Sequence, residues 1–394
     1  MYLTYILPLL SFVLPDLASA AGWKNLDPSK YTLRESAYYK DRVDPLAAVL
    51  PNRNVSSLLA DANHANPLKS PPGVAHVVDS FSWASSSDFD DFGTTKWYPQ
   101  GITGSHDAEA SGLYDSSVLL VSWHSDKYDD GKRGARVSFV DRSDPSKPKY
   151  RHALLVYPNT DANGKPSFRG IKLASDEKGL HAGGMVWYGD LLYVVDTLKG
   201  VRVFDMRCIL EVDDSGDGIG YVGDGKYQAY GYKYILPQVR SYTPPEEGFR
   251  FSFMSLDRTV EPHSILIGEW SPTRTDCRLA RYDLDPSTHL LATSSSKIAT
   301  ASEVLQHPHT DIQGAIRIDG KKYFLTQSTK NLDAGSLITW TKGADNDRVY
   351  KGALMKGPED LSYRRDGDGG KKELWTLSEH PGRRYVYAVD VDAF

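Results

Sequence analysis

The chain is dominated by a repeated pattern of short apolar runs that turn-forming residues separate. The stretch LHAGGMVWYGDLLYVVDTLKGVRVFDM, residues 180–206, contains three such runs, divided by Gly189-Asp190 and by Lys199-Gly200. Runs this short, rich in Val and Tyr and broken at glycine-containing turns, indicate three strands joined by two hairpins. Amphipathic helices between the runs are almost absent, which disfavours a parallel α/β fold.

This pattern recurs along the C-terminal three quarters of the chain. Successive repeats start 83, 69, 61 and 46 residues apart, at Gly101, Gly184, Phe253, Gly314 and Asp360. A constant unit of three or four strands with loops of uneven length is typical of β-propeller blades, whereas a solenoid keeps a tighter spacing. The sequence therefore predicts an all-β chain that forms a β-propeller. Five blades are favoured, and six or seven result if the N-terminal arm or residues 207–245 form another.

The N-terminus reads as a secretion signal. The apolar run Tyr5–Leu14 is followed by the small-residue site Ala18-Ser19-Ala20, which predicts a signal peptide over residues 1–20 that is cleaved before Ala21. A membrane anchor would need about 20 apolar residues, and Pro15-Asp16 cuts this run short. We therefore expect a secreted, extracellular protein, for which the sequon at Asn54 is a glycosylation candidate.

Residues 21–97 show no sustained period and are expected to form an irregular arm that packs on the propeller domain, residues 98–394. Within the arm we expect one helix near residues 56–63 and one strand at residues 76–83. That strand could complete the last repeat.

Composition narrows the partners. The net charge of −5 gives no electrostatic case for binding nucleic acid or an anionic membrane. The 24 Tyr and 8 Trp suit strands and carbohydrate-facing surfaces. Cys208 and Cys277 are either one disulfide in an oxidising compartment or two buried thiols. We expect a monomer.

Propeller geometry predicts where functional residues gather, because the first-strand starts and the loops between second and third strands share one face. His and Tyr can transfer protons, and Trp and Tyr can stack on sugar rings. Arg can bind a carboxylate with two parallel hydrogen bonds. The catalytic candidates are His181, Tyr98 and His124. The substrate-binding candidates are Gln100, Trp123, Arg133, Arg250, Gln313, Glu359, His380 and Arg383. The alternative is that these polar residues only line a water-filled channel.

His181 is singled out because it is the only histidine at the start of a first strand. The two glycines that follow Ala182 would let a ligand approach the backbone.

An acidic loop resembles a calcium-binding pattern. Asp213, Ser215, Asp217 and Asp224 offer oxygen ligands at spacings similar to those of an EF-hand loop, with Gly218 for the sharp turn. Flanking helices are absent and the last ligand is Asp rather than Glu, so a solvated acidic turn is the alternative. This acidic loop makes Ca²⁺ the one cofactor that the sequence indicates.

Several catalytic motifs are missing. The chain has no G-x-S-x-G, no H-E-x-x-H, no P-loop and no dinucleotide-binding glycine pattern before a helix. These absences disfavour a serine hydrolase, a zinc protease, an NTPase and a dehydrogenase.

The segments WYPQGIT, HAGGMVWYGDLLYVVDT, AYGYKYILPQ, FSFMSLDR, PEDLSY and SEHPGRRYVYAV resemble those of secreted propeller proteins of fungi and actinomycetes. The similarity runs from Trp97 to the C-terminus. It implies a relation to fungal lyases that release rhamnose from a glucuronate residue at the side-chain ends of gum arabic. No catalytic residue follows from it.

The leading hypothesis is therefore a polysaccharide lyase that cleaves beside a glucuronate residue by β-elimination. His181 would act with Tyr98 or His124, and an Arg would hold the carboxylate. The first alternative is a glycoside hydrolase, which needs two carboxylates across the pocket, and Glu269, Glu359, Asp360 and Glu379 are available. The second is a glycan-binding propeller without activity. It is disfavoured because the five blade starts carry different residues.

Overall fold

The computed structural model describes residues 16–19, 22–108, 117–125, 133–171, 180–245, 248–329 and 334–394. Over these ranges strands predominate, and the α-helices are α1 (Lys40–Val49), α2 (Val55–Ala60) and the single turn α3 (Ser105–Ala108). The prediction of an all-β chain is confirmed. No helix within the described ranges has the length and apolar character to cross a membrane.

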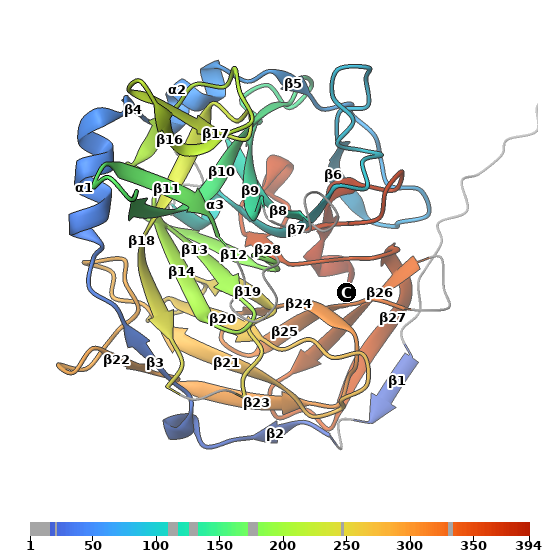
Figure 1. The fold of residues 1–394 in the computed structure, drawn as a ribbon. Helices are drawn as coiled ribbons and strands as arrows, with labels where there is room; N and C mark the ends of the chain where they lie inside the picture. Colours follow the sequence, from blue (N-terminus) through green and yellow to red (C-terminus); the bar gives the residue numbers. More distant parts are fainter. Residues whose placement is uncertain are drawn as a thin grey trace, which may run out of the picture.

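In the described part of the chain, most of the strands form five antiparallel units of four (Figure 1). The first unit contains β7 (Trp97–Gly104), β8 (Val118–Ser125), β9 (Ala135–Asp141) and β10 (Lys149–Thr160). The second contains β12 (Met185–Tyr188), β13 (Leu191–Asp196), β14 (Gly200–Asp205) and β18 (Tyr234–Thr243). The third contains β19 (Phe253–Asp257), β20 (Ser264–Gly268), β21 (Cys277–Asp283) and β23 (Glu303–His307).

The fourth unit contains β24 (Ile312–Ile318), β25 (Lys322–Gln327), β26 (Ala334–Thr341) and β27 (Asn346–Met355). The fifth contains β28 (Ser362–Arg364), β29 (Glu373–Leu377) and β30 (Tyr385–Asp390), and its fourth strand is β6 (Val77–Ser82) from the arm. The first two units are continuous, because their outer strands β10 and β18 pair in parallel.

Side chains of one unit bond to the backbone of the next. The Ser122 hydroxyl donates to the carbonyl of Ala182 at 2.7 Å, which joins the first unit to the second. The Ser255 hydroxyl donates to the carbonyl of Ala315 at 2.6 Å, which joins the third to the fourth. Gly184 packs so closely on the third unit that an added Cβ would lie 2.1 Å from a backbone nitrogen. A glycine is therefore required there.

Asp360, just before β28, joins three units at the centre. Its Oδ2 accepts from the backbone nitrogens of Ile102 on β7 and Met185 on β12, both at 3.3 Å. Asp360 is fully buried. Antiparallel sheets arranged around a shared centre in this way are typical of a β-propeller.

The N-terminal arm runs around the outside of these units and adds a strand to successive edges (blue in Figure 1). Its strand β1 (Asp16–Ser19) pairs with β27, β2 (Lys24–Asn25) with β23, and β3 (Thr32–Glu35) with β18 and β22 (Ile298–Thr300). Further along, β4 (Asn52–Arg53) pairs with β15 (Ile209–Glu211), β5 (His64–Ala65) with β10, and β6 with β30.

Two predictions about the arm are confirmed. The strand expected at residues 76–83 is β6, and it completes the last repeat. The helix expected near residues 56–63 is α2, which begins one residue earlier; the Asn54 side chain accepts from Ser57 N at 2.8 Å and caps it. The signal peptide stays a prediction: residues 1–15 lie outside the described ranges, and β1 falls within its last residues. Glycosylation of Asn54 also stays a prediction.

Residues 207–245 provide β15, a small hairpin of β16 (Ile219–Gly223) and β17 (Lys226–Ala229), and then β18 of the second unit. A short strand β11 (Pro166–Gly170) pairs antiparallel with β10.

Candidate functional site

A pocket of about 450 Å³ opens where the starts of the first strands meet the loops between second and third strands. Its walls therefore come from all five units, which places one pocket at the shared centre. The lining residues are Gln100, His181, Thr197, Leu198, Arg250, Ser252, Trp270, Gln313, Glu359 and Glu379.

Six of the residues named from sequence thus converge on this pocket: Gln100, His181, Arg250, Gln313, Glu359 and Glu379, the last as a hydrolase carboxylate. Trp270 and Glu379 lie at equivalent loop positions of other units. Thr197, Leu198 and Ser252 were not predicted. Nothing in their residue type marks them, although they lie beside positions that the repeat pattern indicates.

Two carboxylates face the pocket in different environments. Glu359 is 2% exposed, whereas the Glu379 side chain is 22% exposed. Burial raises the pKa of Glu359 well above its usual value, and the neighbouring Glu379 and Asp360 raise it further. Glu359 is therefore a carboxyl group that holds its proton more firmly than a free glutamic acid does.

Glutamine amides position both carboxylates. Gln100 Nε2 donates to Glu379 Oε2 at 3.1 Å, and Gln313 Nε2 donates to Glu359 Oε1 at 3.4 Å. The backbone of Glu359 is also held, because the Thr326 hydroxyl donates to its carbonyl at 2.7 Å.

The three catalytic candidates from sequence form a stack of rings. The ring centres of Tyr98 and His124 are 5.6 Å apart, and those of His124 and His181 are 4.4 Å apart. Burial lowers the pKa of His124 well below its usual value, and His181 lowers it further. His124 is thus neutral at neutral pH. Of the three, His181 lines the pocket, while Tyr98 and His124 are not among its lining residues.

A cation and an indole form another wall. The Arg250 guanidinium lies 5.6 Å from the centre of the Trp270 ring. By contrast, Glu269, a candidate carboxylate, is buried and paired with Arg278, whose Nη2 donates to its Oε1 at 2.6 Å. Glu269 is therefore committed to an ion pair and does not line the pocket.

Trp123 is part of the core, which contradicts its prediction as a substrate-binding residue. It is fully buried, its indole Nε1 donates to Ser138 Oγ at 2.8 Å, and its ring centre lies 4.7 Å from that of Trp83. A sugar could reach it only by displacing the core.

The other predicted binding residues lie outside the pocket wall. Arg133 forms a two-pronged ion pair with Asp217, at 2.9 and 2.7 Å, so it is not available to clamp a carboxylate. Arg383 is exposed and is not among the pocket-lining residues. His380 lies beside the pocket, with Nδ1 3.6 Å from Glu379 Oε1.

Arg384 was not predicted, although it supports the site. It is fully buried, and its guanidinium donates to the carbonyls of Glu379, Asp91 and Trp97 at 2.7, 2.8 and 2.7 Å. It also lies 5.2 Å from the centre of the Tyr98 ring. In the sequence pair Arg383-Arg384, nothing indicates which arginine is buried.

The structure does not bring the predicted calcium ligands together. Asp213 Oδ1 accepts from the backbone nitrogen of Ser215 at 2.9 Å, as in a simple turn. Asp217 is paired with Arg133, and Asp224 lies in the turn between β16 and β17 with a φ of 49°. The side chain of Gln228 fills the loop and accepts from Gly218 N at 3.2 Å. This geometry fits the alternative, an acidic turn.

Cys208 and Cys277 are free thiols and are both buried, so the predicted disulfide is not formed. Burial raises the pKa of Cys208 to about 12 and that of Cys277 to about 11. The alternative of two inert buried thiols is the observed one.

Comparison with protein families and with curated proteins found no match. Among solved structures, the chain is similar to a GH43_1 enzyme from Xanthomonas citri, whose structure was determined in complex with xylose. The TM-score is 0.37 at 10% sequence identity, over 86% of this chain and 94% of that chain. A similarity of this size assigns neither a family nor an activity.

Proposed function

We propose that this chain is a secreted glycoside hydrolase on a five-bladed β-propeller, acting on a polysaccharide or oligosaccharide in the 450 Å³ pocket. The observation that carries the proposal is a pair of carboxylates in one pocket whose environments differ. Glu359 is buried and Glu379 is partly exposed. Glycosidases use such a pair, because one carboxyl group must arrive protonated and the other ionised.

Glu359 is the proposed general acid. Its raised pKa keeps a proton available for the glycosidic oxygen of the leaving sugar. Glu379, more exposed and held by Gln100, is the proposed partner that activates water or attacks the sugar carbon. His181 lines the same pocket and can bind a sugar hydroxyl.

Substrate recognition is assigned to the wall formed by Trp270 and Arg250. An indole face stacks on a pyranose ring, and a guanidinium binds a uronate carboxylate. The exposed Arg250 beside the ring of Trp270 therefore favours a glycan that contains glucuronate.

The five-bladed fold is supported by the five antiparallel units and by the arm strand β6 that closes the fifth. Secretion is supported by the apolar run before Ala18-Ser19-Ala20.

A β-eliminating lyase is the second candidate, and the stack of Tyr98, His124 and His181 favours it. Arg250 would neutralise the uronate carboxylate, and His181 would remove the proton beside it. It ranks second because two of the three rings are not among the pocket-lining residues, whereas both carboxylates are.

The test is incubation of the purified chain with gum arabic and a panel of uronate-containing and neutral glycans, with two readouts. We expect new reducing ends and no absorbance from an unsaturated uronate. Glu359→Gln and Glu379→Gln should abolish the reducing ends. The control Glu261→Gln, at a side chain that is 75% exposed, should retain them.

An unsaturated product would overturn hydrolysis in favour of the lyase. Glycan binding without turnover would leave a non-catalytic propeller. If the chain neither bound nor turned over any glycan of the panel, a carbohydrate substrate would be rejected.

A further inference from the structure

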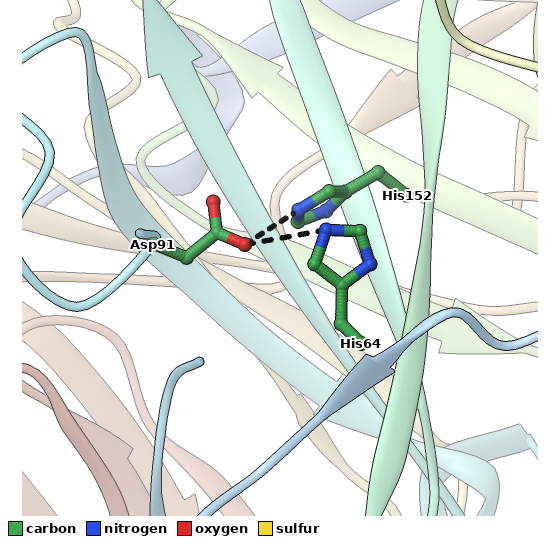
Figure 2. Close-up of side chains that lie close together, drawn as sticks. All are labelled: His64, Asp91 and His152. Carbon is green, nitrogen blue, oxygen red and sulfur yellow. Dashed lines mark hydrogen bonds and ion pairs between the residues drawn. The ribbon is translucent and has the colours of Figure 1, made fainter. Parts of the chain in front are cut away.

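A second cluster of titratable side chains lies away from the pocket, where the arm meets the first unit. It consists of His64 on β5, Asp91 in the arm and His152 on β10 (Figure 2). The three residues are 8%, 6% and 5% exposed, and one ligand atom from each lies within 4.8 Å of the other two. None of them lines the pocket described above.

Each imidazole is held by its Nδ1 so that its Nε2 faces the carboxylate. His64 Nδ1 lies 2.6 Å from Asn63 Oδ1, and His152 Nδ1 lies 3.0 Å from Ser138 Oγ. An amide oxygen accepts a hydrogen bond, so His64 carries its proton on Nδ1 and directs the lone pair of Nε2 at Asp91. Histidines that bind metals are oriented in this way by an outer oxygen on the second ring nitrogen.

A lone pair that faces a carboxylate oxygen is unfavourable unless a proton or a cation lies between them. Asp91 Oδ2 is 3.8 Å from His64 Nε2 and 3.1 Å from His152 Nε2 (dashed lines in Figure 2). Zinc bonds of about 2.0–2.1 Å in a tetrahedron place neighbouring ligand atoms about 3.3 Å apart. The two distances bracket that value, so a small movement of the rings would complete the site.

Outer contacts fix the carboxylate, and one side of the cluster is open. Arg136 Nη2 donates to Asp91 Oδ1 at 2.5 Å, and the Tyr150 hydroxyl donates to Asp91 Oδ2 at 2.6 Å. All three residues of the cluster line a pocket of about 390 Å³, which leaves room for water at a fourth coordination position.

We propose that His64 Nε2, His152 Nε2 and Asp91 Oδ2 bind one Zn²⁺ ion, with water as the fourth ligand. The His152 proton then resides on Nδ1, where Ser138 Oγ can accept it. Because two ligands come from the arm and one from β10, the ion fastens the arm to the first unit. Imidazole with carboxylate is a donor set that suits zinc, whereas calcium prefers oxygen ligands alone.

The test is a calorimetric titration of the chelator-treated full chain with Zn²⁺ alone, followed by thermal unfolding with and without the ion. We expect one site per chain and a higher midpoint of unfolding with Zn²⁺. Co²⁺ in the same site should give the intense visible absorption of a tetrahedral complex.

Two variants locate the site. His64→Gln should weaken Zn²⁺ binding by at least about 100-fold, and Asn63→Ala, at an exposed outer residue, should weaken it by about 10- to 100-fold. The control His380→Gln, at a side chain that is 40% exposed, should bind as the wild type does. Circular dichroism establishes that each variant is folded.

No stoichiometric binding by the wild type would overturn the proposal and leave a hydrogen-bonded network around Arg136. Binding that survives both His64→Gln and Asn63→Ala would place the ion elsewhere and overturn it equally. If His64→Gln does not fold, the wild-type titration and Asn63→Ala still decide.

Discussion

Arg384→Met should destabilise the fold by about 3 kcal/mol. The guanidinium makes three hydrogen bonds to backbone carbonyls, at 2.7, 2.8 and 2.7 Å, and is fully buried. Methionine fills similar space but donates nothing, so the three carbonyls lose their partner. At about 1–3 kcal/mol for each unsatisfied group, the loss is about 6 kcal/mol.

A buried charge offsets part of that loss. Burial, together with the nearby charge of Arg136, lowers the pKa of Arg384 from the usual value of an arginine to about 10. A change of that size corresponds to about 3 kcal/mol by which the fold disfavours the charged side chain, and methionine removes this cost. The difference between loss and gain gives the expected 3 kcal/mol.

The assay is urea unfolding followed by tryptophan fluorescence, with Arg383→Met as the matched control. Arg383 is the preceding residue and its side chain is exposed, so the control should lie within about 0.5 kcal/mol of the wild type. If Arg384→Met unfolded with the wild-type midpoint, the three bonds would contribute no net stability and the reasoning would fail. Equal destabilisation by both variants would refute it as well.

Three further results are expected. Glu359→Gln should lower the turnover of glycan by about 100- to 10,000-fold. The variant should also be more stable than the wild type at neutral pH. Because the pKa of Glu359 is raised in the folded state, the folded wild type binds a proton that the unfolded chain releases. The free energy of unfolding of the wild type therefore falls as the pH rises above about 4.5. Urea midpoints at pH 4 and pH 7 should therefore differ more for the wild type than for the variant. Cys208 and Cys277 should react slowly with a thiol reagent in the folded chain, because both thiols are buried. After unfolding without a reductant, both thiols should react. If the two cysteines formed a disulfide, no thiol would react. Trp270→Ala should raise the KM for glycan by about 10-fold with kcat little changed, and a pure loss of kcat would refute stacking as its role.

The repeats could be predicted because their determinants are local. Strand and turn patterns such as the one around Gly189-Asp190 depend on a few neighbouring residues, and the observed β12–β13 hairpin has its turn there. The strand β6 could be predicted for the same reason, since its apolar content stands out within an irregular arm. The pairing of β6 with β30 could also be predicted. The fifth repeat has only three strands of its own, so its outer strand needs a partner from elsewhere in the chain.

The pocket could be predicted in part, because the architecture brings the first-strand starts together whatever their residue type. Predictions failed where the direction of a side chain decided the outcome. Trp123 and His124 both belong to β8, and consecutive residues of a strand point to opposite faces. Trp123 therefore enters the core while His124 stacks on His181. The sequence contains no turn signal that marks the end of β8 at Ser125.

The cluster of His64, Asp91 and His152 could not be predicted, because its members share no spacing in the sequence. They meet only because β5 of the arm pairs with the outer strand β10, a contact between distant segments whose register is set by tertiary packing. A metal site of the zinc-finger or H-E-x-x-H type can be found from its spacing. A site assembled across an arm cannot.

The arm is therefore part of the functional scaffold rather than an appendage to residues 98–394. It supplies the fourth strand of the fifth unit, and that unit carries both Glu359 and Glu379. Through Arg384, the same guanidinium holds the backbone carbonyls of Asp91 in the arm and Glu379 in the pocket. A chain that begins at residue 98 would lose that strand and leave Arg384 without two of its three carbonyls, those of Asp91 and Trp97. The irregular sequence of the arm reflects its position on the rim, where each short strand pairs with a different edge and no common period is imposed.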